Sequence, residues 1–587
     1  MQKLMKASSE DRDTFFKLIK TQCTASTTTT QELLVDGILR TSEEEICQGW
    51  KEHFGKLATP QDNNTYDTKY QQLVESDIKT IRQIIETYDT EPIQISVEQV
   101  RKAIGKLNTG KAPDADGITA EHLKNAGILL AGSITQIMNG IMKVQIIPER
   151  LKLGTLTPIW KKNEKNIPTN YRGITVISVL GKILESILKE ELVPVITRKQ
   201  SKFQRGFTKS TSPLNASLIM QEMILDSQQA NKTLYVAYLD AKAAFDVVSH
   251  SSLLRKLYLS GISNALWTMI ADTFRCASSV VKWNGLLSEP FEILQGVRQG
   301  GILSADEYKL YVNDLLLTLE GTSHGARIGN ITCAAPTCAD DVALMAHTRE
   351  DLQCMLDICH NYSRMERYQL QPTKSMVMIF NPKTPTEVLQ ENSPFTLGED
   401  QVPVVSKATH IGLIRDTDNT GKKSTLKNNV TKARKALYSL MGAGLHGTNG
   451  LRPALVIHLF TIYIIPILTY GLEIFLPSDN ELKETTVFYE KTIKHLLSLP
   501  NNCARPAIYI LSGLNPLQRL IHARALSLFG SIARNAESIE HHLAARQLTM
   551  KQPKDNSWFI KVKNILAVYD LPSALDLLDN PPQKNSG

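Results

Sequence analysis

The feature that most constrains this chain is a pair of adjacent acids between two apolar runs. The runs are ITCAAPTC (331–338) and VALMAH (342–347), and Ala339, Asp340 and Asp341 separate them. Two apolar runs joined by so few residues predict a β-hairpin with both acids at its turn. Aspartate is also an ordinary turn residue. The pair by itself therefore leaves a purely structural role open.

A second strand-like run also ends in an acid. The segment TLYVAYLDA (233–241) is rich in β-formers, and Asp240 lies at its end. If this strand pairs with the hairpin, three carboxylates come together, which is costly unless a divalent cation neutralises them. Hard oxygen ligands favour Mg²⁺, with Mn²⁺ as the alternative. Two such ions about 4 Å apart serve in-line phosphoryl transfer. The pairing of the strands is an inference that the sequence alone does not establish.

The elements around these acids predict an α+β fold. A helix is expected from near Thr348, followed by the strand SMVMIF (375–380). Strand, helix, hairpin, helix and strand in this order indicate an antiparallel sheet backed by helices. Residues 382–425 are polar and are expected to be rich in loops, whereas the chain from about residue 426 is expected to be helical.

The first part of the chain is predicted to be polar and helical. Residues 1–90 include a helix start at Thr41 and Ser42, and a further helix begins at Ser96 with Gln99 as the second half of a capping box. Short strands are expected after it, among them GITVISVL (173–180), followed by a helix over 182–192.

The length of the chain limits the number of subdomains, and its charge limits the class of partner. A chain of 587 residues is too long for one core, so two to four subdomains are expected. The formal net charge is +7, which permits a polyanionic partner without requiring one. Residues 143–209 hold 14 Lys and Arg against 5 Asp and Glu, a local net charge of 14 − 5 = +9. Such a stretch either neutralises phosphates or forms a solvated basic face.

The eight cysteines are scattered and match no zinc-finger spacing. Reduced thiols of this kind indicate an intracellular protein, nuclear or cytoplasmic.

The run LVIHLFTIYIIPILTYGLEIFL (455–476) is long enough to span a membrane. Its His458, Pro466, Gly471 and Glu473 favour instead a buried helix pair that is broken near Pro466.

Taken in order, a series of motifs resembles the reverse transcriptases of non-LTR (LINE-type) retrotransposons. The motifs span roughly residues 40–500 and are KAPDADGITAEHLKNAG (111–127), LTPIWKKNEKNIPTNYRGITVISVLGKILESIL (156–188), FQRGFTKSTS (203–212), YLDAKAAFDVVSH (238–250), ILQGVRQGGILSADEYKLYVNDL (293–315), PTCADDVALMA (336–346), QPTKSMVMIF (371–380) and THIGLI (409–414). The segments LTYGLEIF (468–475) and KTIKHLLSLP (491–500) resemble the thumb of that family.

The resemblance implies roles for particular residues. Asp240 and Asp340 would hold the metals, with Asp341 supporting them, and Asp246 would orient a turn. The candidates for nucleotide binding are Lys161, Arg172, Phe245, Gln299 and Gly300, and Lys374 is the candidate proton donor to the leaving pyrophosphate. Phe245 would select deoxynucleotides by blocking the ribose 2′-OH, although a core aromatic is the simpler interpretation. The chain has Cys338 where the family usually has an aromatic residue, and Ala305 where proline is common.

The resemblance also implies a right-hand polymerase fold. The expected parts are an N-terminal helical extension (1–90), fingers (91–232), a palm with the catalytic aspartates (233–425), a helical thumb (426–500), and a C-terminal helical region with a tail (501–587). The implied activity is RNA-directed DNA synthesis, with an RNA template, a DNA primer and dNTPs as partners.

Two other functions remain open from the sequence. The chain could be a catalytically silent or domesticated nucleic-acid-binding remnant, or a related intron-type reverse transcriptase. Residues 1–90 are too few for the endonuclease that such elements usually carry, and residues 501–587 hold only Cys503 and no CCHC knuckle. An element without its nuclease domain is therefore expected.

Overall fold

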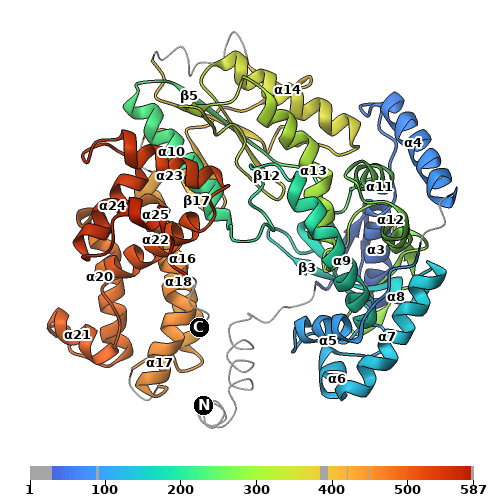
Figure 1. The fold of residues 1–587 in the computed structure, drawn as a ribbon. Coiled ribbons are helices and arrows are strands. Elements are labelled where there is room, and N and C mark those ends of the chain that lie inside the picture. Colours follow the sequence, from blue (N-terminus) through green and yellow to red (C-terminus); the bar gives the residue numbers. More distant parts are fainter. Residues whose placement is uncertain (1–29, 88–90, 384–393, 419–420, 448–449, 584–587) are drawn as a thin grey trace.

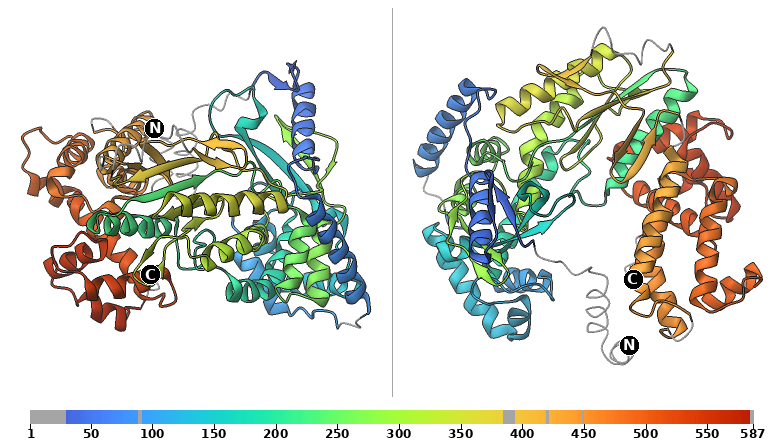
Figure 2. Two further views of the ribbon diagram at one scale, coloured as in Figure 1. Left: turned by 90° about the horizontal axis from the view of Figure 1, so that it is seen from above. Right: turned by 180° about the vertical axis from the view of Figure 1, so that it is seen from behind.

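The computed structural model describes residues 30–87, 91–383, 394–418, 421–447 and 450–583. Figure 1 shows an arch. The blue and cyan N-terminal elements form one side, the orange and red C-terminal helices form the other, and a sheet with its helices crosses the top. Figure 2 shows the same arrangement from above and from behind.

The sheet at the top of the arch has four strands in the order β11-β12-β5-β13, and every neighbouring pair is antiparallel. Its strands are β5 (Leu234–Leu239), β11 (Thr337–Cys338), β12 (Asp341–Ala346) and β13 (Met376–Phe380). All six residues of β5 are buried, which explains the unbroken run of apolar and aromatic residues in this strand. Leu239 lies opposite Val342, so the predicted pairing of the two acid-bearing strands is confirmed.

Three helices accompany this sheet: α10 (Pro213–Gln229), α13 (Ser304–Gly321) and α14 (Arg349–Met365). The predicted start of α14 is confirmed, because the Thr348 hydroxyl accepts a hydrogen bond from the Asp351 backbone N–H at 3.1 Å. Sheet and helices together confirm the α+β prediction. The division into fingers, palm and thumb stays a prediction.

A second, five-stranded sheet lies in the blue and cyan side of the arch. Its strands are β3 (Leu153–Trp160), β4 (Tyr171–Ile177), β6 (Ser278–Trp283), β7 (Leu286–Leu287) and β8 (Phe291–Glu292). The helices of this side and its flank are α3 (Glu43–Leu57), α4 (Thr68–Thr87), α5 (Val97–Lys106), α6 (Ala120–Asn125), α7 (Gly127–Val144), α8 (Glu149–Lys152), α9 (Val179–Lys199), α11 (His250–Leu259) and α12 (Asn264–Phe274). The capping boxes at Ser42 and Ser96 are both present.

The C-terminal side is helical throughout its described residues, as predicted. Its elements are α16 (Gly421–Met441), α17 (Pro453–Leu459), a π-helical turn (Phe460–Ile464), α18 (Ile465–Thr469), α19 (Leu472–Phe475), α20 (Asp479–Leu496), α21 (Arg505–Ser512), α22 (Leu517–Ala533), α23 (Ile539–Met550), α24 (Trp558–Val568) and α25 (Ala574–Asp579).

The apolar run 455–476 breaks at a different place from the one predicted. Pro466 lies inside a continuous helix formed by α17, the π-helical turn and α18, directly after the π-helical turn, where its missing N–H cannot make the ordinary α-helical bond. The chain turns instead at Gly471, whose φ is 74°. Among the described helices, none is both long and apolar enough to cross a membrane.

Two predictions of local structure were wrong and a third was incomplete, all because short strands leave little periodicity to recognise. Residues 382–425, expected to be rich in loops, also contain β14 (Phe395–Leu397), β15 (Asp400–Val402), β16 (Lys407–His410) and β17 (Leu413–Asp416), while 384–393 and 419–420 lie outside the described residues. The run 331–338 is divided between β10 (Ile331–Thr332), which pairs with β9 (Arg327–Ile328), and β11. The N-terminal segment, expected to be helical, contains the hairpin of β1 (Leu33–Val35) and β2 (Ile38–Arg40). Residues 1–29 lie outside the described residues.

A smaller correction concerns the run 173–180. Its strand ends at Ile177, and the Ser178 hydroxyl caps α9 by accepting a bond from the Gly181 N–H at 3.5 Å. The helix predicted over 182–192 therefore begins earlier and extends to Lys199.

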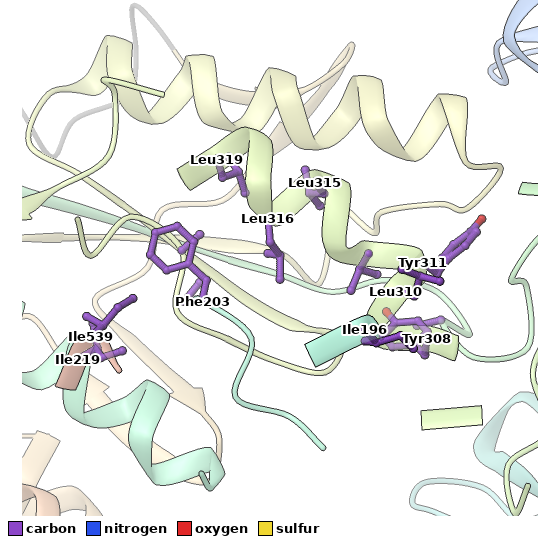
Figure 3. Close-up of a cluster of buried hydrophobic side chains, with 14 of the residues drawn as sticks. Ile196, Phe203, Ile219, Tyr308, Leu310, Tyr311, Leu315, Leu316, Leu319 and Ile539 are labelled. Atoms are coloured by element: carbon purple, nitrogen blue, oxygen red, sulfur yellow. The ribbon is translucent and has the colours of Figure 1, made fainter. Parts of the chain in front are cut away.

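The largest hydrophobic core joins distant parts of the chain. It includes the sheet strand β5, the helix α13 and residues of α22, α23 and α24. In Figure 3 the side chains of Phe203 and Ile219 lie beside Ile539 of α23. The C-terminal helices are therefore packed into the same core as the sheet, and they are not a loosely attached extension.

Candidate active site

The three predicted carboxylates lie at neighbouring ends of β5 and β12. Asp240 directly follows β5, and Asp340 occupies the tight turn between β11 and β12, where Ala339 adopts a left-handed φ of 60°. Burial and the charge of Asp240 raise the pKa of Asp340. Burial and the charges of Asp340 and Asp240 raise the pKa of Asp341 to about 6. The structure thus brings all three acids within electrostatic range, and Arg172 and Lys161 offset only part of the rise in the pKa of Asp340.

Asp240 is held by residues next to β13. Its carboxylate accepts a hydrogen bond from the Gln371 side-chain amide at 2.9 Å, and its backbone N–H donates to the Ser375 hydroxyl at 3.2 Å. The Lys374 ammonium lies 3.9 Å from the same carboxylate, and both side chains are about half exposed (63% and 46%). Lys374 therefore lies beside Asp240.

Two cations face the acids from the β3–β4 hairpin. Arg172 lies in β4 opposite Ile159, and Lys161 follows the last residue of β3. Burial and the charge of Arg172 lower the pKa of Lys161, whereas Asp246 and Asp340 act in the opposite direction. Two separate sheets thus contribute one basic wall and one acidic wall to the same site. A polyphosphate could bridge these walls, because its oxygens accept bonds from cations and share metal ions with carboxylates.

Phe245 lies beneath the site in an aromatic stack. Its ring is 4.4 Å from that of Tyr308 at an interplanar angle of 14°, and Phe207 approaches it edge-on at 6.0 Å. Phe245 is only partly buried, whereas Tyr308 is buried. The stack fixes the orientation of Phe245 while leaving part of its ring accessible from the site.

Gln299 and Gly300 lie beside this stack. The Gln299 amide donates to both carboxylate oxygens of Asp246 at 3.1 Å, and the Gln299 carbonyl accepts from the Thr175 N–H at 2.9 Å. Burial raises the pKa of Asp246 to about 6. Gly300 has a φ of 139°, and a Cβ there would lie 2.1 Å from the Thr175 carbonyl oxygen. Only glycine therefore fits where the segment before α13 passes β4.

A clamp around the acidic turn was missed by the sequence reasoning. The buried Gln204 accepts hydrogen bonds through its side-chain oxygen from the backbone N–H groups of Ala339 at 2.9 Å and Gly206 at 2.7 Å. A Cβ on Gly206 would lie 2.3 Å from the Ala339 nitrogen. Next to this contact, the Arg205 backbone N–H donates a hydrogen bond to the carbonyl of Thr337 in β11 at 2.8 Å. The motif FQRGF signalled proximity to the site, but not this contact.

Cys338 stands at the end of β11, next to the acids. Burial and the charges of Asp341 and Asp340 raise the pKa of its thiol to about 11, so the residue is an uncharged thiol at neutral pH. The seven cysteines in the described part of the chain are all free, which agrees with the expected reduced state.

The carboxylates suit a hard divalent cation by their chemistry. Within the described residues, no three His, Cys, Asp or Glu side chains already converge as a metal cage. Three acids that repel one another at the ends of adjacent strands nevertheless form a donor set that a divalent cation would neutralise. The residues present therefore fit Mg²⁺ by donor type.

Comparison with known proteins agrees with this architecture. Residues 159–404 match the family model described as "Reverse transcriptase (RNA-dependent DNA polymerase)". The matched segment contains β5, the hairpin of β11 and β12, and all three aspartates. It also contains the basic residues Lys161 and Arg172. This segment, which is less than half of the chain, is thus similar to the reverse transcriptases.

Among the relatives, the "Retrovirus-related Pol polyprotein from type-2 retrotransposable element R2DM" of Drosophila melanogaster is 29% identical over 53% of this chain and 30% of its own length. The polyprotein of the retrotransposable element R2 of Popillia japonica is 26% identical over 70% of this chain and 56% of its own. The "RNA-directed DNA polymerase from mobile element jockey" of Drosophila melanogaster is 21% identical over 71% and 46%.

The chain is therefore similar, over part of its length, to the reverse transcriptases of retrotransposable elements such as R2 and jockey. It spans between 30% and 56% of the length of these relatives.

Proposed function

We propose that the chain is an RNA-directed DNA polymerase, which extends a primer 3′-OH with dNTPs on an RNA template. The observation that carries the proposal is that a cluster of carboxylates, the acidic wall, lies opposite a pair of cations, the basic wall. Asp240, Asp340 and Asp341 form the acidic wall, and Lys161 and Arg172 form the basic wall. This arrangement suits phosphoryl transfer, in which positioning and charge stabilisation supply most of the catalysis.

Asp240 and Asp340 would hold the divalent ions, with Asp341 supporting them. Bound Mg²⁺ would polarise the attacking hydroxyl and stabilise the leaving pyrophosphate. Lys161 and Arg172 would bind the triphosphate oxygens and orient them. Lys374 would donate a proton to the leaving pyrophosphate, because it is a cation beside Asp240 with most of its side chain in solvent. Phe245 would press against the sugar, and Gln299 with Gly300 would support the template base and nucleotide.

The remaining parts of the proposal concern the whole chain. The side of the arch with α5, α7 and α9 would be the fingers, the four-stranded sheet the palm, and α16 to α20 the thumb. The partners would be an RNA template and an annealed DNA primer. A silent nucleic-acid-binding remnant is the competing function, and a single assay separates the two.

The test is primer extension by the purified protein with an RNA template, an annealed DNA primer, dNTPs and Mg²⁺. We expect extension by the native protein and its loss, by a factor of about 10³ or more, in Asp340→Asn, because the variant removes a charge from the acidic wall. Asp62→Asn is the matched control, since Asp62 is a fully exposed acid 3.8 Å from Arg367. Extension at a normal rate by Asp340→Asn would overturn the assignment. Salt-dependent RNA binding without any extension by the native protein would favour the silent remnant.

A further inference from the structure

A buried ion pair links the C-terminal helices to the segment that clamps the acidic turn. The Arg205 guanidinium contacts the Glu540 carboxylate in a bidentate manner, with Nε–Oε1 and Nη2–Oε2 distances of 2.7 Å. The two side chains are 4% and 0% exposed. Loss of one member of such a pair is strongly destabilising, because it leaves the other as an uncompensated buried charge. Glu540 lies in α23, and Arg205 precedes Gly206 of the clamp.

The ion pair is connected to the catalytic turn through short, direct bonds. The Arg205 backbone N–H donates to Thr337 in β11, and the neighbouring Gln204 accepts from the Ala339 N–H. Ala339 directly precedes Asp340. A change in the position of Arg205 is therefore transmitted to Asp340 through backbone groups that have little freedom to compensate.

Other contacts of α23 reach the strands that lead into the hairpin. The Arg546 side chain covers Gly329, where a Cβ would lie 2.3 Å from Arg546 Nε, at the turn between β9 and β10. Ile539 is buried against the same core as Phe203, beside which it lies in Figure 3. The helix thus contacts the hairpin region at several separate points.

We infer that α23 is a brace for the catalytic turn, and that Glu540 is a positioning residue that acts through Arg205. The inference rests on the proposed polymerase function for its effect on catalysis. The Glu540 carboxylate is bound by Arg205 and not by the acids or the candidate nucleotide-binding residues, so Glu540 affects the position of Asp340 and not substrate binding. Displacements of about 1 Å at reacting groups can lower a rate by about two orders of magnitude.

The first experiment separates kcat from KM. Glu540→Gln keeps the shape of the side chain and leaves the Arg205 charge unpaired, so we expect kcat to fall at least tenfold while KM for dNTPs and the affinity for template–primer change less than twofold. The double variant Arg205→Met/Glu540→Met leaves no buried charge and should recover a large part of the kcat lost in either single variant, since an apolar pair often replaces an ion pair without loss of stability.

A matched control uses another ion pair of the same helix. Lys551 closes α23 and contacts Asp226 of α10 at 2.8 Å, away from the clamp. Asp226→Asn should keep kcat within twofold of the native protein. Equal losses of kcat in Asp226→Asn and Glu540→Gln would overturn the inference, because they would indicate general destabilisation. A native kcat in folded Glu540→Gln would overturn it as well.

A second measurement does not depend on catalysis. We expect the backbone amides of residues 337–341 to exchange with D₂O at least tenfold faster in Glu540→Gln than in the native protein, and at the native rate in Asp226→Asn. Unchanged exchange at these amides in Glu540→Gln would show that α23 does not brace the turn. If the native protein fails to extend a primer, the proposed function is wrong, and the exchange rates still decide whether the brace exists.

Discussion

At the scale of single residues, the acids of the site are held in mutual repulsion. The raised pKa values of Asp340 and Asp341 come from burial together with the charges of the neighbouring aspartates. Ionisation of Asp340 and of Asp341 therefore opposes folding. A divalent cation bound to these carboxylates would offset that cost.

This repulsion predicts a stabilising substitution. The pKa of Asp341 rises from an ordinary value of 3.8 to about 6 on folding, so its ionisation opposes folding fully above pH 6 and not at all below the unfolded pKa. Asp341→Asn should therefore raise the free energy of unfolding by about 1 kcal/mol at pH 7.5 in EDTA, after discounting for solvent exposure. The gain should shrink between pH 6 and pH 4. Urea unfolding at several pH values measures it, and a loss of stability at pH 7.5 would contradict the interpretation.

Phe245 gives a prediction about substrate choice. Because Tyr308 stacks on its ring, the ring has a fixed position from which it can exclude a 2′-OH. Phe245→Val should raise the ratio of rNTP to dNTP incorporation at least tenfold. Tyr308→Phe is the control, since it keeps the stacked ring and should leave the ratio unchanged. If Phe245→Val lowers stability without changing the ratio, Phe245 is a core aromatic only.

At the scale of elements, the site depends on a close crossing of two chain segments. Gly206 lies against Ala339 with no room for a Cβ, and Gln204 satisfies the N–H groups on both sides of this contact. The crossing explains how a two-strand hairpin with a strained Ala339 keeps one conformation. It also makes the turn sensitive to changes in the segment that precedes α10.

Gly206→Ala should consequently lower primer extension at least tenfold, because the added methyl group forces the acidic turn to move. Gly105→Ala in α5 is the control, since a Cβ there meets nothing within 4 Å and alanine favours the helix. Extension rates and urea unfolding are measured on both variants. Normal extension by Gly206→Ala would mean that the turn tolerates a wider crossing.

The sequence was most informative where one residue pattern determines one element. The strand β5, the acidic hairpin and the caps at Ser42, Ser96 and Thr348 were all predictable, because apolar runs and caps are local signals. The strands β14 to β17 were not, since strands of three or four residues are shorter than any reliable period. The clamp by Gln204 was also beyond prediction, because it joins residues 135 positions apart whose pairing depends on packing.

At the scale of the whole molecule, charge is distributed differently from what the sequence indicated. Four of the 14 cations of the basic stretch 143–209 are neutralised within the fold, in the pairs Arg150–Asp116, Lys152–Asp272, Lys189–Asp306 and Arg205–Glu540. The helix α16 has no acidic residue and exposes Lys423, Lys427 and Arg434. These three recur every four or seven residues and so share one face of the helix.

This face predicts a change in salt dependence. Replacing Lys423, Lys427 and Arg434 together by alanine should reduce the slope of log K against log salt by about 2–3 for an RNA–DNA duplex, because fewer phosphate counterions are released. Replacing Lys56, Lys102 and Lys106 is the control, since each contacts an acid within 3 Å. Filter binding or fluorescence anisotropy at several salt concentrations measures the slopes. An equal change in both triple variants would assign the effect to net charge.

The ion pair between Arg205 and Glu540 also has a consequence for the order of events during protein synthesis. Its members are 335 residues apart, and a ribosome adding about 5–20 residues per second needs roughly 15–70 s to make the intervening chain. While the last 199 residues of this stretch are made (540 − 341 = 199), both acids of the hairpin are already synthesised but the Arg205 guanidinium still has no carboxylate partner. Nascent chains therefore pass through a stage in which the catalytic residues exist without their support, and a reaction started during translation should begin only after α23 has left the ribosomal tunnel and docked.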